Sequence, residues 1–572
     1  MEDNGYFIKS LIKKQAPFNI LAMLMSVIAP LVCTALAGVH FGSGGLAIMA
    51  ICAPLFFAAS FFGFIISGGG QILCSQFIAK DELDNVNKVY SAVYALTLLL
   101  DILMCAALFI FKTPLLTLLA GEITPELSAY YNIFVLNAFA VMLIYIPIFL
   151  CKTAGKPQIG LLTTGIMALV SCVLSFVFIG FTGIEGIALA QAVGTGTALI
   201  VSVIMLGRHF KFVLPKKLFI KQIFTLGSPG GLTRLYILLT TLVLNMLFLN
   251  IGGIEALAVF GVVATLHRFT GAVIIGTSQT LIPLVGVFHE EQDITSIKQT
   301  IKYIFFYGNI LMLIFGALYC VFGAGIAALF GLPADSGFAA VMPPYAVYCI
   351  LLLNATVFSS YYNAIKELFL ANIIVLLQEF ALLCGAALFL AVNFDFGRIW
   401  FAFPASSVLT FGVLFALLLI GRIRSKENTA FLLLNRNLQK NGKYISFSID
   451  SGPEHISEAA AKIGDFCEES GLPLEETMLI SMSVEEIVTL ITGNSKNKSF
   501  SVSVRLFLLD GIIILRIRNT GEKFDVIEYY KSNIADDIEK SLDVLGMKYI
   551  VETAKVIYYR QTFGVNNLVV II

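Results

Sequence analysis

The sequence predicts a membrane protein of twelve transmembrane helices in two six-helix bundles, followed by a cytoplasmic α/β sandwich domain. Hydrophobic residues make up 58% of the 572-residue chain and charged residues only 13%, which is about half the charged fraction of a typical soluble protein. The long apolar segments stop near residue 425, and strand and helix patterns of ordinary polarity follow. The two halves of the apolar part also resemble each other, as described below.

Twelve apolar segments are long enough to cross a bilayer, which takes about 20 helical residues. They cover residues 18–40, 45–77, 89–111, 129–151, 158–181, 184–207, 224–250, 256–287, 300–330, 341–364, 369–393 and 399–421. Cytoplasmic loops are enriched in Lys and Arg. With the N-terminus in the cytoplasm, 18 basic residues fall on the inner side and only Lys112 and Arg398 on the outer side. We therefore expect a multi-pass protein of the cytoplasmic membrane with both termini in the cytoplasm.

The membrane part contains an internal repeat at an offset of 211 residues, since Leu46-Ala47 aligns with Leu257-Ala258. Each half has a long Gly-rich second span followed by a charged inner loop, AKDELDN in one half and EEQDITS in the other. Such repeats are typical of secondary transporters, whose substrate site lies between two bundles. The predicted domains are a first bundle at 1–207, a basic linker at 208–223, a second bundle at 224–425, a linker at 426–440 and a soluble domain at 441–572.

Two stretches of the membrane part carry a family resemblance. GLAIMAICAPLFFAAS with GGGQILCSQFIAKDELDNVNKV resembles the second and third spans of the multidrug and toxic compound extrusion (MATE) family. LGSPGGLTRLYILLTTLVLNMLFLNIGGIEALAVFGVVATLHR with TLIPLVG is similar to its seventh and eighth spans. The resemblance covers nearly all of residues 10–425. It implies a secondary antiporter, not an enzyme, that expels drugs, organic cations or other amphipathic compounds in exchange for Na⁺ or H⁺.

The chain departs from the family pattern at the family's coupling positions. The first span commonly carries an Asp in a VDxxxVG pattern, where VCTALAG places Cys33. The fifth span commonly carries Asn and Asp, where this chain has Ser171 and Ser175, and the eighth often carries Glu, where it has His267. Cys and Ser supply no negative charge for a cation. We therefore expect the usual coupling site of the first bundle to be lost.

Other ionisable residues fall within the spans, namely Asp101, Arg234, His267, Arg268 and Glu379. A charge at the centre of a bilayer costs at least about 2.5 kcal/mol, so each of these residues is a functional candidate. Either carboxylate could carry a proton, and the three bases could recognise an anionic group of a substrate. The structural alternative is that a carboxylate and an arginine neutralise each other inside the bundle.

Residues 441–572 alternate strand and helix patterns. KYISFSID reads as a strand, 454–470 and 474–492 as amphipathic helices, and FSVSVRLFLL with IIILRIRN as a hairpin around Asp510-Gly511. A helix at 546–554 and a closing hairpin follow. Residues 427–572 have 15 basic against 20 acidic side chains, whereas residues 1–426 have 22 against 17. An acidic domain argues against nucleic-acid binding.

This order of elements resembles the GHKL (Bergerat-fold) ATPase-like domain, most closely in anti-sigma-factor kinases and less so in histidine kinases. LPLEETMLISMSVEEIVTLITGN resembles the N-box helix, with its glutamate at Glu486 and its Mg²⁺-binding Asn replaced by Leu490. IRNTGEKFD resembles the adenine-binding loop, with Asn519 and Gly521 at its motif positions. VLGMKYIVETAKVIYYRQTFGVNNLVVI resembles the final glycine turn, helix and hairpin, in which Gly546 is kept.

These replacements have chemical consequences. Leu490 cannot bind Mg²⁺, which neutralises charge in phosphoryl transfer, so we expect neither ATPase nor kinase turnover. Asn519 can still accept a hydrogen bond from adenine through its amide oxygen, so ATP binding stays open. We expect no metal site, an ion gradient rather than a cofactor as energy source, and a regulatory role for the domain. A cytoplasmic protein partner is the alternative ligand.

Two other functions are compatible with the residues. A transporter-shaped sensor would bind a ligand without coupled flux, while its tail binds a signalling protein. The missing coupling residues of the first bundle favour it. A lipid-linked precursor flippase is the other alternative, and the family-like second and eighth spans argue against it.

Overall fold

The structure is a computed structural model of the chain. It describes residues 5–79, 83–120, 123–153, 156–208, 210–213, 219–290, 293–333, 336–424, 432–433, 443–450, 452–495, 500–509, 512–533, 545–562 and 565–572. The chain divides into two compact units. The membrane unit comprises Pro17–Gln279 and Phe305–Phe415, and the tail unit comprises Met1–Ala16, Thr280–Ile304 and Ala416–Ile572. Most of the predicted linker 426–440 and residues 214–218 of the basic linker lie outside the described residues.

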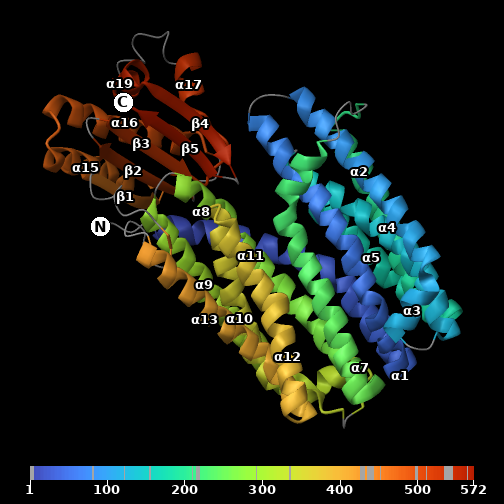
Figure 1. Ribbon diagram of the computed structural model, residues 1–572. Helices are drawn as coiled ribbons and strands as arrows, with labels where there is room; N and C mark the ends of the chain where they lie inside the picture. Colours follow the sequence, from blue (N-terminus) through green and yellow to red (C-terminus); the bar gives the residue numbers. More distant parts are fainter. Residues whose placement is uncertain are drawn as a thin grey trace. The chain divides into compact units, whose positions relative to one another are not determined.

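The membrane unit is built from long apolar helices (Figure 1). In chain order the helices are α1 (Gly5–Ala79), α2 (Leu83–Ile110), α3 (Lys112–Ala120), α4 (Pro125–Thr153), α5 (Pro157–Thr182), α6 (Glu185–Gly207), α7 (Ile220–Gln279), α9 (Ile294–Leu329), α10 (Phe338–Ala364), α11 (Leu368–Leu376), η1 (Leu377–Ala381), α12 (Leu382–Asn393), η2 (Phe396–Phe401) and α13 (Ala402–Arg424). Within the described residues, ten helices are long and apolar enough to cross a membrane. They cover the twelve predicted spans, because α1 and α7 each contain two.

The two double-length helices are each interrupted at a glycine. Gly42 has φ 60° and ψ −147°, and Gly253 has φ 68° and ψ −160°. Side chains with a Cβ rarely adopt this conformation, so glycine is the residue that permits the interruption. The two glycines are separated by the offset of the sequence repeat. The repeat predicted from sequence therefore extends to the backbone break between the first two spans of each half.

The second span of α1 and the start of α7 approach each other at backbone distance. A Cβ at Gly69 would overlap the carbonyl oxygen of Ile223, and one at Gly227 would overlap that of Ile65. Small residues allow such close helix contacts in membranes. The Gly-rich second span thus joins the first half of the membrane unit to the second half.

The tail unit contains a five-stranded antiparallel sheet in the order β1-β2-β3-β5-β4 (Figure 1). Its strands are β1 (Lys443–Asp450), β2 (Ser501–Leu509), β3 (Ile512–Asn519), β4 (Val556–Thr562) and β5 (Val565–Ile571). Its helices are α8 (Leu281–Glu290), α15 (Pro453–Ser470), α16 (Leu474–Gly493), α17 (Val526–Asn533) and α19 (Leu545–Thr553). The predicted strands and helices of this domain are confirmed, whereas α17 is an additional helix. The predicted Asp510-Gly511 turn lies outside the described residues.

The two faces of the sheet differ in chemistry. One face contributes Val504, Leu515 and Leu568 to an apolar core that includes Val484 and Ile550 of the helices. The opposite face carries polar and basic side chains that are also buried, among them Ser503, Arg505 and Arg518. Successive strand residues point to opposite faces, so the alternation of apolar and polar residues in β2 and β3 sets this division. The tail is thus an α/β domain with a polar sheet face turned toward other parts of its own unit.

Candidate functional site

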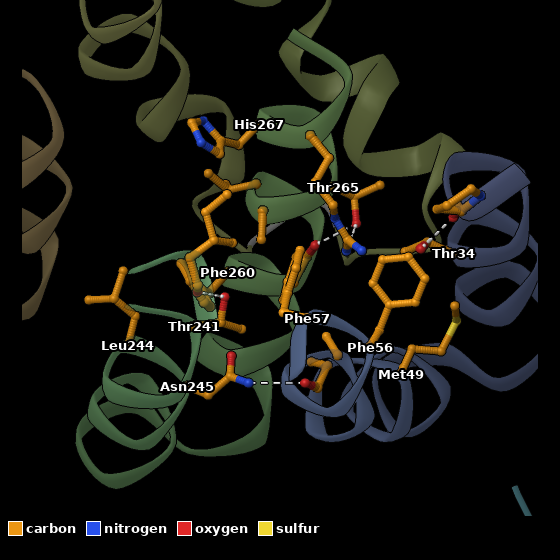
Figure 2. Close-up of a pocket in the computed structure, with 18 of the residues that line it drawn as sticks. Thr34, Met49, Phe56, Phe57, Thr241, Leu244, Asn245, Phe260, Thr265 and His267 are labelled. Carbon is orange, nitrogen blue, oxygen red and sulfur yellow. Dashed lines mark hydrogen bonds between the residues drawn. The ribbon is translucent and has the colours of Figure 1, made fainter. Parts of the chain in front are cut away.

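An apolar pocket lies within the membrane unit and is lined by both halves. The first half contributes residues of α1, α4 and α6, and the second half contributes α7, η1, α12 and α13. Five phenylalanines form much of its wall: Phe56, Phe57, Phe134, Phe260 and Phe403. Figure 2 shows Phe56 and Phe57 on one side and Thr241, Leu244 and Phe260 on the other. An apolar cavity with a few convergent polar groups is a typical binding site for a small molecule.

Three of the six predicted coupling or substrate residues line this pocket, namely His267, Arg268 and Glu379. His267 Nε2 lies 4.0 Å from Glu379 Oε2, and both side chains are partly buried. The imidazole of His267 also lies against the ring of Tyr348, with the ring centres 5.7 Å apart. The structure therefore brings an acid and a base from two different helices together at one wall of the pocket.

Glu379 is placed by a local irregularity of its helix. It lies in η1, a π-helical turn between α11 and α12. Single π turns in α-helices are frequent at functional sites. The hydroxyl of Thr240 donates a hydrogen bond to the main-chain oxygen of Glu379. The neighbouring Gln378 donates through Nε2 to Ser407 Oγ at 2.7 Å. Polar side chains of α7 and α13 thus fix the turn that presents the carboxylate.

The two arginines of α7 have different surroundings. Arg268 Nη2 lies 3.3 Å from Thr265 Oγ1, one turn earlier on the same helix. Arg234 is not among the pocket-lining residues, and its guanidinium stacks 4.4 Å from the ring centre of Phe64 in α1. Only Arg268 is therefore placed to contact a molecule in the pocket.

The residues at the family's coupling positions in the first half meet as a neutral cluster. Cys33 Sγ lies 3.3 Å from Ser175 Oγ, which in turn donates to the main-chain oxygen of Ser171 at 2.7 Å. All three residues are buried. Cys33 is not among the pocket-lining residues, although its neighbour Thr34 is. The three positions lie together in the structure, and none of the three side chains is an acid or a base.

Asp101 lies away from the pocket-lining set. It is fully buried in α2, and its nearest polar contact is Cys105 Sγ, 3.9 Å from Oδ1. Its Oδ2 atom has no hydrogen-bond partner among the residues that the structure describes. The two carboxylates predicted as coupling candidates therefore occupy different environments.

Sequence reasoning did not single out several polar residues that line the pocket: Tyr130, Gln191, Thr240 and Thr241. Asn245 is a further polar residue of the pocket lining. Its Nδ2 donates to the main-chain oxygen of Ala50 at 3.0 Å, so it joins the two halves and also lines the pocket (Figure 2). Each of these residues could have been noticed in the sequence as a polar side chain within an apolar span. The sequence does not indicate which polar side chains face the same cavity.

In the tail domain, Glu486 and Gly546 are in contact. The Glu486 carboxylate accepts hydrogen bonds from the main-chain nitrogens of Gly546 at 3.2 Å and Met547 at 2.8 Å. It therefore caps the N-terminus of α19, where a negative charge is favourable. Burial raises the pKa of Glu486, and these two hydrogen bonds offset part of the rise.

Asn519 and Gly521 form a second group. Asn519 Oδ1 accepts hydrogen bonds from the Gly521 main-chain nitrogen at 3.1 Å and from Asn566 Nδ2 at 2.8 Å. Asn566 Nδ2 also donates to the Gly521 main-chain oxygen at 3.1 Å. The amide oxygen of Asn519 is thus bound to this chain's own groups, and a ligand that used it would have to replace those hydrogen bonds.

Comparisons with known proteins agree on the membrane part. The family model MatE matches residues 19–177. The multidrug export protein MepA of Staphylococcus haemolyticus (strain JCSC1435) is 25% identical over 389 residues, which cover 64% of this chain and 83% of that protein. MepA of Staphylococcus aureus (strain bovine RF122 / ET3-1) is 28% identical over 177 residues, or 29% of this chain and 39% of the relative.

Solved structures extend the comparison to the fold. An inward-facing multidrug resistance MATE transporter of the MOP superfamily has a TM-score of 0.63 at 17% identity, over 71% of this chain and 97% of its own. A MOP superfamily transporter from Pyrococcus furiosus, whose binding pocket is described as having reverse polarity, has a TM-score of 0.62 at 17% identity, over 73% and 96%. At 17% identity, these likenesses show that the membrane part shares the fold of MATE-type transporters.

Proposed function

We propose that this protein is a gradient-driven exporter of amphipathic compounds in the cytoplasmic membrane, and that its pocket is the substrate site. The observation that carries the proposal is an apolar cavity, lined by both halves of a repeat, at which Glu379 meets His267. Transporters with such repeats bind substrate between the two halves and alternate access by rocking them. The multidrug export described for the MepA relatives supports the same activity here.

Glu379 is our candidate for ion coupling by H⁺ or Na⁺. It is the only carboxylate among the residues lining the described pocket. Coupling needs a group whose occupancy changes during the cycle, and a carboxylate beside a histidine can exchange a proton or accept a cation. The cluster of Cys33, Ser171 and Ser175 contains no acidic side chain that could bind a cation. We therefore place coupling in the second half of the protein.

The test is efflux from membrane vesicles that contain the purified full chain. Imposed pH and Na⁺ gradients are applied separately, with a panel of fluorescent amphipathic compounds. We expect efflux that stops when the effective gradient is collapsed by an ionophore. If no gradient drives efflux of any compound while a ligand still binds, the transporter-shaped sensor becomes the better description.

We propose further that the tail domain regulates transport through an ionic clamp to the segment that starts α9. The clamp consists of Asp293, Arg505 and Arg518. Asp293 Oδ2 lies 3.4 Å from Nη1 of each arginine. All three side chains are at most 8% exposed, and the Arg518 guanidinium also covers the ring of Phe288 at 4.9 Å. Burial lowers the pKa of Arg518 to about 9. Removing these charged side chains from water therefore costs free energy, which the contacts between Asp293 and the two arginines must offset.

Asp293 serves a second purpose in the same place. Its Oδ1 accepts a hydrogen bond from the Ser296 main-chain nitrogen at 3.1 Å, and its Oδ2 one from Ser296 Oγ at 2.8 Å. Asp293 is thus the N-cap of α9, a helix whose later residues belong to the membrane unit. A change of state in the sheet that moved either arginine would act directly on the first turn of this helix.

The regulatory proposal is tested with Asp293→Asn, because asparagine is as good an N-cap as aspartate but has no charge. Efflux is compared with wild type and with Glu458→Gln, which removes a surface acid paired with Lys462 in the same unit. We expect Asp293→Asn to change the efflux rate by about threefold or more, whereas Glu458→Gln does not. Equal rates in all three proteins would contradict regulation through the clamp.

A further inference from the structure

We propose that the pocket binds an anionic group of its substrate at Arg268, so that its substrates are amphipathic carboxylates or related anions. The inference rests on the proposed transport function and names the substrate class. It begins with the charges at the cavity wall. Of the ionisable side chains lining the described pocket, Arg268 and His267 are bases and Glu379 is the only carboxylate.

The acid of the pocket does not neutralise Arg268. Among the described residues, the basic group within 4.0 Å of the Glu379 carboxylate is the His267 imidazole, which carries a charge only when it is protonated. Within the part of the chain that the structure describes, no ion pair within 4.0 Å involves Arg268, whose hydrogen bond goes to the neutral hydroxyl of Thr265. The described surroundings therefore leave a permanent positive charge at an apolar cavity without a counter-charge.

A guanidinium in this position is costly until an anion reaches it. It offers five N–H donors in a planar fork that matches a carboxylate or phosphate, and only one hydrogen bond is made within the described part of the chain. An anion would gain charge-assisted, two-pronged hydrogen bonds where little water competes. An organic cation would instead be repelled by the same charge.

The other residues of the pocket wall suit the hydrophobic body of an amphipathic anion. Phe56, Phe57, Phe134 and Phe260 provide aromatic and apolar surface for a hydrophobic body. Thr34, Thr241 and Asn245 are neutral polar groups at the same cavity. The pocket thus has one strong site for an anion, and its other lining groups favour an apolar or weakly polar body.

The experiment compares two isosteric probes, 7-diethylaminocoumarin-3-carboxylate and its neutral 3-carboxamide. Binding of each to the purified full chain in detergent is measured by fluorescence anisotropy. We expect wild type to bind the carboxylate about tenfold or more tightly than the carboxamide, as a charge-assisted contact predicts. Equal affinity, or tighter binding of the carboxamide, overturns the inference without any variant.

Variants then locate the site. Arg268→Gln should abolish the preference for the carboxylate while keeping carboxamide binding, and Arg268→Lys should keep a smaller preference because lysine lacks the planar fork. Arg398→Gln removes an arginine that packs on Phe394 outside the pocket-lining set, so its preference should equal that of wild type. If Arg268→Gln prefers the carboxylate over the carboxamide as strongly as wild type does, the assignment of the anion site to Arg268 is overturned.

Failure of the inference and failure of the transport proposal give different results. If gradients drive efflux but the carboxylate has no advantage, the protein is an exporter and Arg268 does not select its substrates. If the carboxylate is preferred in binding but no gradient moves it, the anion site stands and the coupled-transport proposal falls.

Discussion

The imidazole of His267 and the carboxylate of Glu379 meet at one wall of the membrane pocket, with Nε2 4.0 Å from Oε2. They come from α7 and from the π turn η1, which are more than a hundred residues apart in sequence. A base on one helix and an acid on another form a contact that can change when either helix moves. It can also change when the acid gains or loses a bound proton or cation. This contact is the basis of the first prediction.

Glu379→Gln keeps the size of the side chain but removes its charge and its ability to bind an ion. We expect gradient-driven efflux to fall by about tenfold or more while substrate binding is retained, because glutamine fills the same place in the pocket wall but cannot exchange the coupling ion. Asp101→Asn is the matched comparison, since Asp101 is buried outside the pocket-lining set. A loss of efflux in Asp101→Asn alone would move the coupling role to α2.

Removing the side chain of Asp293 should destabilise the tail unit more than removing only its charge. Asp293→Ala deletes the N-cap of α9 and leaves two buried guanidinium groups without their acid. Breaking a buried ion pair in this way costs about 3–5 kcal/mol, and losing the cap about 1 kcal/mol more. Hydrogen exchange of the β2 and β3 amides in the full chain measures the effect. Protection equal to that of wild type would show that the clamp is not formed in solution.

The two interruption glycines should be sensitive to a single methyl group. At Gly42 and Gly253 an added Cβ would meet no atom within 4 Å, so any cost of alanine comes from the positive φ alone. We expect each Gly→Ala change to cost about 1–3 kcal/mol. Gly44→Ala and Gly271→Ala are controls without a positive φ or a nearby atom. Thermal unfolding followed with a thiol-reactive dye compares the four variants, and equal melting temperatures would refute the prediction.

Gly69 should be sensitive for a different reason. An alanine there would overlap the backbone of Ile223, whereas at the adjacent Gly68 the nearest atom is 3.6 Å away on the ring of Phe149. Inserting a methyl group against backbone forces two helices apart, at a cost of about 1–3 kcal/mol or more. We expect Gly69→Ala to lower the yield of monodisperse protein on size exclusion and Gly68→Ala to leave it unchanged. The reverse order would be incompatible with the helix contact described.

The stability of α19 should depend on pH through Glu486. Burial raises its pKa, so the folded domain holds the proton more tightly than the unfolded chain does. The contribution to stability is therefore complete below the unfolded pKa of about 4.3 and is lost as pH rises through the raised folded pKa.

Hydrogen exchange of residues 545–553 in the full chain, corrected for the intrinsic rate, measures this dependence. The opening free energy should fall as pH rises from about 4.3 through the raised folded pKa in wild type, and it should fall less in Glu486→Gln. Glu475→Gln alters an exposed acid of α16, the helix that also carries Glu486, and should behave as wild type. An identical slope in all three proteins would exclude Glu486 as its source.

The sequence by itself determined the local structure of this protein. Apolar length defined the spans, because a helix must satisfy its backbone within the bilayer. Period-two alternation defined strands such as β1 and β3, and Gly471, with φ 88°, ends α15 where it was expected to break the helical pattern. The repeat offset of 211 residues also relates Gly42 to Gly253, the two glycines at which the structure interrupts α1 and α7.

Tertiary structure alone decided which residues meet. Asp101 and Glu379 look alike in sequence as acids within apolar spans, yet only Glu379 lines the pocket. Asp293 looked like an ordinary charge in an inner loop, yet it holds two arginines more than 200 residues away. Hydrophobic periodicity reports which side of a helix or strand is buried, but not which distant side chain it is buried against. Which distant side chains meet depends on how whole helices and strands pack together, and no local pattern in a single sequence predicts this.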